Sequence, residues 1–466
     1  MTTATSSIPK TDFWTADRVA DALATLAAVN LPRGPSRFGR VWTDTRTVER
    51  GDLFVALIGE RFDAHDFVKD AVAKGACGVV ISNPAAGRGL GVPVFEVPDT
   101  LVALGALANF YRRAWNGPIV GVVGTNGKTS TKELIKAALG GTLDVHATRG
   151  NLNNLIGVPL TLLAIPSAAD VAVVEMGTNQ PGEVPRLRAI VEPNLTVVTS
   201  VAEEHLEGLG DLAGVMREEM AATEGVAVAI VPVSQPEVVD AARSRATRVV
   251  AAGLDAGDLR AESWSVLADG RGVLTVDGDR IDVPLRGVHN LRNAMLALAV
   301  ARELGVSHSD AARGIATMPA PPMRVNWELH GRATLINDAY NSNPGSARAA
   351  IELLEHAGAG RQRVAVLGTM LELGPQGPRL HEEVARHALA TGIEVVAAIG
   401  EFASALGRIA PGDPRVICAD DVDALWSGLS SRLAPDAVIL LKGSRGMRLE
   451  RLVDPITDWA NSRQPA

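Results

Sequence analysis

A glycine-rich loop that ends in a lysine is the clearest chemical signal in the sequence. The residues GTNGKTST, 124–131, follow the apolar run PIVGVV and lead into KELIKAAL. A buried strand that passes through a glycine loop into a helix brings backbone N–H groups and the positive helix end to one point, where an anion binds. The common phosphate-binding pattern has Gly, four residues and then Gly-Lys-Ser/Thr, but the residue five before Gly127 is Val122. The pattern therefore predicts a nucleotide site with a shortened loop, and the alternative is a glycine-rich turn with an exposed lysine.

In such a site two side chains of the loop have defined tasks. Lys128 would contact the β- and γ-phosphates, and the Thr129 hydroxyl would bind Mg²⁺. The Asn-Lys-x-Asp motif with which GTPases read the base is absent from the sequence. The run DVAVVEMG ends in Glu175 where many ATPases have aspartate, so the carboxylate that binds the metal would be a glutamate.

Composition limits the class of protein. With 466 residues the chain exceeds one hydrophobic core, so two or three domains are expected. An apolar fraction of 47% with 21% charged residues fits a globular protein, and a net charge of −8 argues against nucleic acid as a partner. Only Cys77 and Cys418 are available, which indicates a reducing cytoplasm and no disulfide framework. The sequence shows neither a secretory signal nor a membrane span.

The pattern of apolar runs predicts α/β structure throughout. Strands are expected at 52–57 and 77–82 and helices at 65–75 and 100–115, before a boundary near 116–120. Further strands at 170–177 and 194–201, separated by helical stretches, imply a largely parallel sheet. A hairpin around Asp277-Gly278 is expected at the edge of that sheet.

The Pro-rich segment TMPAPPMRVN predicts a hinge near 318–323, and a second doubly wound unit follows it. Strands of this unit are expected at 333–340, 363–368, 394–400, 415–419 and 437–443. The predicted architecture has three domains, residues 1–115, 116–320 and 321–466. The second is a P-loop mononucleotide-binding parallel sheet, and the third is Rossmann-like.

Several separated motifs, in order along the chain, resemble the Mur ligases of peptidoglycan synthesis. They are DTRTVERGDLFVALIGERFDAHDF, GTNGKTSTKE, TRGNLNNLIGVPLTLL, EMGTNQPGEV, HLEGLGDLAGV, GVHNLRNAMLALA, INDAYNSNPGSARAAIELL and VILLKGSRGMRLE. The resemblance runs from about residue 40 to 455. The shortened phosphate loop is that family's own version.

The resemblance implies an ATP- and Mg²⁺-dependent ligase that forms an amide through an acyl phosphate. NLNNLIGVPLTLL and EMGTNQPGEV resemble the dipeptide-adding branch, which implies UDP-N-acetylmuramoyl tripeptide and D-alanyl-D-alanine as substrates. A cytoplasmic monomer is expected. The alternatives are another amino-acid ligase of the same superfamily and a nucleotide-binding paralogue without catalytic activity.

The resemblance also assigns roles to individual residues. Lys128, Glu175, His205 and Arg324 would be catalytic, and Thr129, Glu175 and His205 would hold Mg²⁺. The nucleotide would contact Gly124, Thr125, Asn126, Gly127, Lys128, Thr129, Ser130, His289, Asn290, Asn293, Arg324, Asp338, Tyr340 and Asn341, with Asn343 as a further candidate. The first domain, residues 1–115, would bind the UDP-sugar part of the substrate. The substrates would contact Asp44, Thr45, Arg46, Asn151, Asn153, Asn154, Lys442, Ser444 and Arg445.

Simpler structural roles stay open for some of these residues. Asn290 could be a helix cap and NSNPG a plain turn. His205 could be a polar loop residue, and the stretch from Lys442 to Arg445 an exposed basic turn.

One departure from the family pattern bears on the metal. Most such ligases carry a lysine that reacts with carbon dioxide to give a carbamate ligand, but Glu219 occupies that position and no lysine lies between 136 and 442. We expect Glu219, or its neighbour Glu218, to supply the carboxylate; the alternative is that both lie on a solvated helix face. Thr369 and Gln180 also differ from the residues that the family usually has there, Asp and His.

Overall fold

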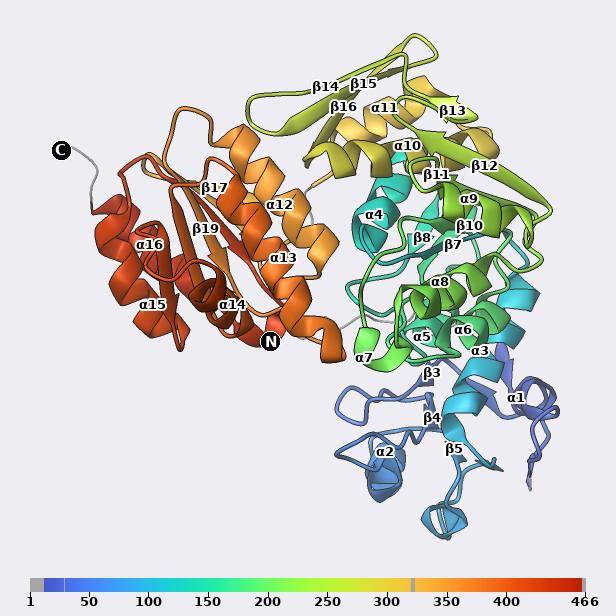
Figure 1. The fold of residues 1–466 in the computed structure, drawn as a ribbon. Helices are drawn as coiled ribbons and strands as arrows, with labels where there is room; N and C mark the ends of the chain where they lie inside the picture. Colours follow the sequence, from blue (N-terminus) through green and yellow to red (C-terminus); the bar gives the residue numbers. More distant parts are fainter. Residues whose placement is uncertain (1–11, 29, 320–322, 463–466) are drawn as a thin grey trace. The chain divides into compact units, whose positions relative to one another are not determined.

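The computed structural model describes residues 12–28, 30–319 and 323–462 (Figure 1). The chain forms two compact units. Unit 1 comprises residues 1–121, 143–178 and 182–195, and unit 2 comprises 122–142, 179–181 and 196–466. Residues 320–322 of the predicted hinge lie outside the described residues. The three-domain boundaries at 115 and 320 stay predictions.

Unit 1 contains a small parallel sheet. Its order is β3-β4-β5-β6, with β3 at Val41–Trp42, β4 at Leu53–Val55, β5 at Gly78–Ile81 and β6 at Val94–Glu96. Buried Phe54, Val68, Val79 and Ile81 form its core together with Ala71. The predicted helix over 65–75 is divided into the 3₁₀ turn η1, Ala64–Phe67, and α2, Val68–Ala73.

The predicted helix over 100–115 is confirmed as α3, Thr100–Trp115. The Asp99 side chain accepts hydrogen bonds from the N–H groups of Leu101 and Val102 and so caps its first turn. The helix ends where Asn116 takes a left-handed conformation. The short pair β1, Trp14–Thr15, and β2, Arg37–Phe38, precedes it in the chain with α1, Ala16–Leu23.

A seven-stranded sheet carries the strands predicted from residue 119 onward. Its order is β13-β12-β11-β10-β7-β9-β8. β7 (Ile119–Val123) and β9 (Val171–Glu175) are buried along their whole length, and the ladders β8–β9, β11–β12 and β12–β13 are parallel. Continuous apolar runs of this kind suit strands covered on both faces. The other strands are β8 at Val145–Ala147, β10 at Leu195–Val198, β11 at Val228–Pro232, β12 at Arg248–Gly253 and β13 at Leu259–Arg260.

The predicted hairpin forms, but its predicted place was wrong. β15 (Arg271–Val276) and β16 (Asp279–Arg286) pair around Asp277 and Gly278, which both have positive φ. They do not extend the large sheet, whose edge is β13; they form a separate antiparallel sheet with β14, Ser263–Val266. The alternating apolar side chains give this sheet one buried face, and that face packs on α10 (Val288–Glu303) and α11 (His308–Ala316).

The C-terminal part of unit 2 is the doubly wound sheet expected from the sequence. Its order is β17-β18-β22-β19-β20-β21, with β17 antiparallel and the rest parallel. The strands are Asn326–His330, Ala333–Asp338, Val438–Lys442, Arg363–Leu367, Val395–Ile399 and Val416–Ala419 in that order, and the helices are α12 at Pro344–Ala357, α13 at Gly377–Ala390, α14 at Glu401–Ile409, α15 at Val422–Leu429 and α16 at Val453–Asn461. The α/β fold class is confirmed.

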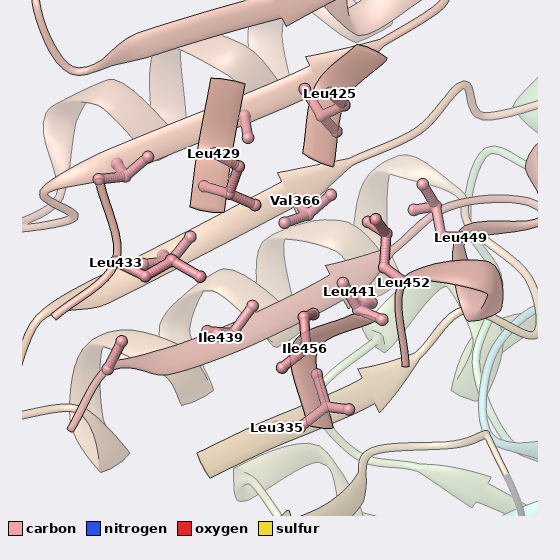
Figure 2. Close-up of a cluster of buried hydrophobic side chains, with 14 of the residues drawn as sticks. Leu335, Val366, Leu425, Leu429, Leu433, Ile439, Leu441, Leu449, Leu452 and Ile456 are labelled. Carbon is pink, nitrogen blue, oxygen red and sulfur yellow. The ribbon is translucent and has the colours of Figure 1, made fainter. Parts of the chain in front are cut away.

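Figure 2 shows the core on one face of this sheet. Leu425 and Leu429 of α15, Ile456 of α16, Val366 of β19, and Ile439 and Leu441 of β22 all belong to this core, and all are buried. Burying each such side chain contributes about 1.5–3 kcal/mol. The core therefore fixes the carboxyl ends of β18 and β22, where several predicted site residues lie.

Among the described residues, no helix is long and apolar enough to cross a membrane. Cys77 and Cys418 are both exposed and unbridged.

Candidate active site

The phosphate loop leaves β7 and enters α4, Lys128–Leu139. Gly124 and Gly127 have φ of +118° and +87°, which favours glycine. A Cβ atom at position 124 would lie 2.7 Å from the carbonyl oxygen of Ser200. The backbone at both glycines therefore has the conformation and the close approach that a phosphate-binding turn requires.

The segment after β10 holds the main chain of this loop. The N–H of Thr125 donates to the Ser200 carbonyl at 2.7 Å, and that of Asn126 donates to the Ser200 hydroxyl at 3.0 Å. The Thr125 hydroxyl accepts from the N–H of Ala202 at 3.0 Å. The Ser130 side chain is buried in the first turn of α4. The loop is thus fixed by protein contacts on one side.

Lys128 does not extend into solvent. Its ammonium group donates to the carbonyl oxygens of Gly124 and Thr125, the second at 3.1 Å, and lies 4.0 Å from a carboxylate oxygen of Glu204. The side chain is 15% exposed. The alternative of a turn with an exposed lysine is therefore wrong, because the lysine folds over its own loop.

Glu219 lies on α8, Leu212–Met220, and contacts the phosphate loop directly. Its Oε2 atom accepts a hydrogen bond from the N–H of Gly124 at 2.8 Å. Burial raises the pKa of Glu219 to about 7, although Lys128 and the Gly124 N–H group act in the opposite direction. Glu218 and Glu219 are both buried, so a solvated helix face is excluded for them. Glu219 is thus hydrogen-bonded to the loop.

His205 immediately precedes α7, Leu206–Leu209, and has a left-handed φ of +53°. Its Nδ1 atom is hydrogen-bonded to the carboxylate of Glu372, and its Nε2 atom lies 3.8 Å from Oε1 of Glu204. Sequence reasoning missed both glutamates. Glu204 could have been found as the acidic neighbour of His205, whereas Glu372 gave no local signal because it is 167 residues away.

His289, Asn290 and Asn293, which were predicted to contact the nucleotide, lie near the start of α10. Gly287 is the N-cap, so the alternative of Asn290 as the cap is wrong. Instead the Asn290 amide donates to the Arg286 carbonyl at 2.8 Å and accepts from the Asn293 amide at 3.1 Å. A Cβ atom at Gly127 would lie 2.8 Å from Oδ1 of Asn293, so this amide faces the phosphate loop.

His289, beside these amides, is half-buried. Loss of hydration lowers its pKa to about 4, partly opposed by the charge of Asp338. The imidazole is therefore neutral near pH 7, so one ring nitrogen can donate a hydrogen bond while the other accepts one.

Asp338 and Lys442 stand at the carboxyl ends of β18 and β22, where the ladder places them side by side. Their side chains form an ion pair of 2.8 Å, and the Lys442 side chain is 3% exposed. Lys442 is therefore not part of an exposed basic turn. Asp338 also accepts from the N–H of Val325 at 3.1 Å, and the Arg324 guanidinium lies over the Tyr340 ring at 4.4 Å. These contacts place the start of β17 against the end of β18.

Asn341 and Asn343 contact the residues around the phosphate loop. The Asn341 amide donates to Glu204 at 2.9 Å, and the Asn343 amide donates to Oδ1 of Asn126 at 2.8 Å. Asn343 is also the N-cap of α12 and forms a capping box with Ser346. The turn and the contact with the loop are both present.

The remaining C-terminal candidates have structural partners. The Ser444 hydroxyl accepts from the N–H of Leu371 at 3.0 Å, and Arg445 lies 3.6 Å from Glu450. Thr369 accepts from the N–H of Glu401 at 2.9 Å, where α14 begins. The departure at Thr369 thus supplies a hydrogen bond at a helix start. Gln180, where the family usually has His, lies in unit 2 beside Gly208. A Cβ atom added to Gly208 would be 3.3 Å from the amide nitrogen of Gln180.

Glu175 lies in unit 1, at the end of β9. The Asn153 amide donates to its Oε1 atom at 2.9 Å. Asn154 accepts from the N–H of Gly157 at 2.8 Å, where α5 (Gly157–Leu163) begins, and Asn151 is exposed. Asn153 is thus brought to a predicted metal ligand, whereas Asn154 shapes a helix start.

Asp44, Thr45 and Arg46 form a tight turn in unit 1. The Arg46 guanidinium contacts the Asp44 carboxylate at 2.7 Å, and this hydrogen bond lowers the pKa of Asp44. The Thr45 carbonyl accepts from the ammonium of Lys74 at 2.8 Å. Arg46 remains 82% exposed, so its guanidinium is accessible to an anionic ligand.

No group of three or more His, Cys, Asp or Glu side chains in the described part of the chain surrounds a common metal position. A divalent ion held by these residues would therefore need ligands other than a cluster of His, Cys, Asp or Glu side chains.

Three models of one protein family match successive parts of the chain. The Mur ligase family, catalytic domain, matches residues 38–112, the Mur ligase middle domain matches 122–301, and the Mur ligase, glutamate ligase domain, matches 323–445. The middle-domain match begins just before the phosphate loop and includes Glu219 and Asn293. The chain belongs to the Mur ligase family. The resemblance seen in the sequence motifs is confirmed.

Two relatives of this Mur ligase share a name. UDP-N-acetylmuramoyl-tripeptide–D-alanyl-D-alanine ligase of Bacillus subtilis is 33% identical over 430 residues, with 90% of this chain and 93% of the relative covered. The Escherichia coli protein of that name is 35% identical over 425 residues, with 89% and 92% covered.

Solved structures agree with this similarity. A crystal structure of MurF from Acinetobacter baumannii has a TM-score of 0.87 at 30% identity and covers 97% of this chain and 100% of its own. MurF ligase from Thermotoga maritima in complex with ADP has a TM-score of 0.81 at 26% identity and covers 92% and 99%.

Proposed function

We propose that this Mur ligase joins D-alanyl-D-alanine to UDP-N-acetylmuramoyl tripeptide at the expense of ATP. The observation that carries the proposal is the phosphate loop, with Gly124 and Gly127 at positive φ and Lys128 folded over it. The relatives that span about nine-tenths of the chain, and are named for this reaction, give the substrate class.

Chemically, the tripeptide carboxylate is a poor electrophile. Transfer of the γ-phosphoryl group from ATP gives an acyl phosphate; the dipeptide amine then attacks, and phosphate leaves from the tetrahedral intermediate. Backbone N–H groups at the start of α4 and the ammonium of Lys128 would hold the phosphates. Arg324, stacked on Tyr340, would add positive charge near the transferred group. Most of the rate would come from positioning and charge neutralisation.

Magnesium fits the donors that unit 2 brings to this loop. The hydroxyl of Thr129, in the first turn of α4, and the carboxylate of Glu219, bonded to Gly124, are oxygen donors, which Mg²⁺ prefers. Because the described residues contain no complete cluster of side-chain ligands, phosphate oxygens and water would complete the set. When bound, Mg²⁺ would neutralise phosphate charge. Glu175 and His205 stay predicted ligands.

The substitution of glutamate for the family's lysine is testable through the metal. We propose that Glu219 supplies the carboxylate that a lysine carbamate supplies in other members. The variant Glu219→Ala should need more Mg²⁺ for half-maximal turnover, whereas added bicarbonate should not change the wild-type rate. Unchanged Mg²⁺ dependence in Glu219→Ala would remove this role.

A substrate panel tests the proposed reaction itself. ADP release should rise when UDP-N-acetylmuramoyl tripeptide and D-alanyl-D-alanine are both present, and the pentapeptide product should appear by mass spectrometry. The same assay with single amino acids and the muramoyl precursors tests the alternative of another ligase of the superfamily, for which ADP release would rise with an amino acid. If no pair of substrates causes ADP release, the non-catalytic paralogue is indicated. Lys128→Ala serves as the inactive control. The cytoplasmic location and the monomeric state stay predictions.

A further inference from the structure

The pair formed by His205 and Glu372 joins two distant segments of unit 2 by more than one contact. The Glu372 carboxylate is bonded to Nδ1 of His205, and the Glu372 carbonyl accepts from the N–H of Glu207 at 3.1 Å. A Cβ atom at Gly374 would lie 3.3 Å from the Cα of Glu207. The segment 372–374 is therefore docked on the segment 205–207 through side chain and backbone.

Both partners have an uncommon backbone conformation. His205 has φ of +53° and Glu372 has φ of +64°. A left-handed conformation costs a non-glycine residue about 1–2 kcal/mol, and it persists where the surrounding structure imposes it. The surrounding structure thus imposes a left-handed conformation on both His205 and Glu372, and in these conformations their side chains meet.

The contact determines which way the imidazole faces. A carboxylate at Nδ1 favours a proton on that nitrogen and leaves Nε2 to the opposite side. On that side Nε2 lies 3.8 Å from Glu204, whose carboxylate is 4.0 Å from the ammonium of Lys128. The His205 ring is 22% exposed, so part of it stays accessible to a ligand beside the phosphate loop.

We infer that Glu372 is a positioning residue, which orients the His205 imidazole so that Nε2 faces the phosphate-loop side of the site. The effect on rate rests on the proposed function, but the orientation of the ring does not. Glu372 acts through His205, and its contribution disappears when His205 is removed.

A double-mutant cycle tests that dependence. Glu372→Ala should lower kcat by about 10–100-fold while the KM for ATP changes little, and Glu372→Gln, which keeps a hydrogen-bonding group, should lose less. In the His205→Ala background Glu372→Ala should cause no further loss. Glu352→Gln, at an exposed position of α12, is the matched control. Equal losses in both backgrounds, or an unchanged kcat in Glu372→Ala, would overturn the inference.

A spectroscopic measurement separates the orientation from catalysis. Protein labelled with ¹⁵N-histidine gives ring nitrogen shifts at pH 8, and the His205→Ala spectrum assigns the His205 signals. Wild-type protein without substrates should carry a proton on Nδ1, and Glu372→Ala should shift toward the Nε2-protonated form. If Glu372→Ala does not fold, Glu372→Gln provides the comparison. A wild-type ring with its only proton on Nε2 contradicts the inference, even if the ligase reaction is confirmed. If the spectrum is as expected but no ligase activity is measured, only the proposed function is contradicted.

Discussion

Replacing Glu219 by glutamine should make the protein more stable at pH 8 and leave its stability unchanged near pH 4. Glutamine keeps the size of the side chain and an oxygen that can accept from the Gly124 N–H group, but it cannot become a buried anion. Burial raises the pKa of Glu219 from 4.5 to about 7 in the folded protein. Between these values the unfolded chain has already lost its proton while the folded protein retains it. Wild-type stability therefore falls as the pH rises through this window.

The size of the effect follows from the shift in pKa. Each pKa unit corresponds to about 1.4 kcal/mol, so a rise of about 2.5 predicts a loss of about 3 kcal/mol between pH 4 and pH 8. Because Glu219 is only 3% exposed, solvent screening reduces this figure little. The opposing attraction of Lys128 is already contained in the raised pKa.

Urea unfolding followed by circular dichroism at pH 4.5, 6 and 8 measures the difference. The midpoint of the transition that includes α4 and β7 should rise in Glu219→Gln relative to wild type as the pH increases. The same replacement at exposed Glu352 controls for the loss of one negative charge. If Glu219→Gln is less stable than wild type at pH 8, the carboxylate is held as a stabilised anion, and the argument from burial is refuted.

Three further outcomes are expected. Gly124→Ala should destabilise the protein by about 1–3 kcal/mol, and it should weaken ADP binding in calorimetry, because a methyl group would press on the Ser200 backbone. Lys442→Met should lower the free energy of unfolding by about 3–5 kcal/mol, because Asp338 would lose its partner. Thermal unfolding of the variant measures this loss, and a change near zero would argue against the ion pair. Asn343→Ala removes the cap of α12 and should cost about 1 kcal/mol, again by thermal unfolding, whereas Asn343→Asp should recover most of it.

Much of the architecture could be predicted from local pattern. Apolar runs such as those of β7 and β9 are continuous because both faces of these strands are covered, so their positions were evident. The hairpin at Asp277-Gly278 was evident too, because its turn requires two residues with positive φ. The sheet to which the hairpin belongs was not evident, because it depends on the helices, α10 and α11, on which the apolar face of the hairpin packs.

The site could be predicted only where neighbours in sequence make the chemistry. The loop around Lys128 carries its own glycines and lies in one stretch. The contacts of Glu372 with His205 and of Glu219 with Gly124 join residues far apart in the chain, and no spacing rule encodes them. The buried partner of Lys442 could have been suspected only from the strand register that places Asp338 beside it.

The way Lys128 is bound has a consequence for ligand selection. Its ammonium already holds two carbonyl oxygens of Gly124 and Thr125, so an arriving anion must compete with neutral acceptors fixed in place. A small ion such as free phosphate would gain little from that exchange, whereas a polyphosphate tail would gain several simultaneous contacts along the α4 amide groups. In the proposed reaction, Lys128 would therefore favour a polyphosphate over a single phosphate before the base makes any contact.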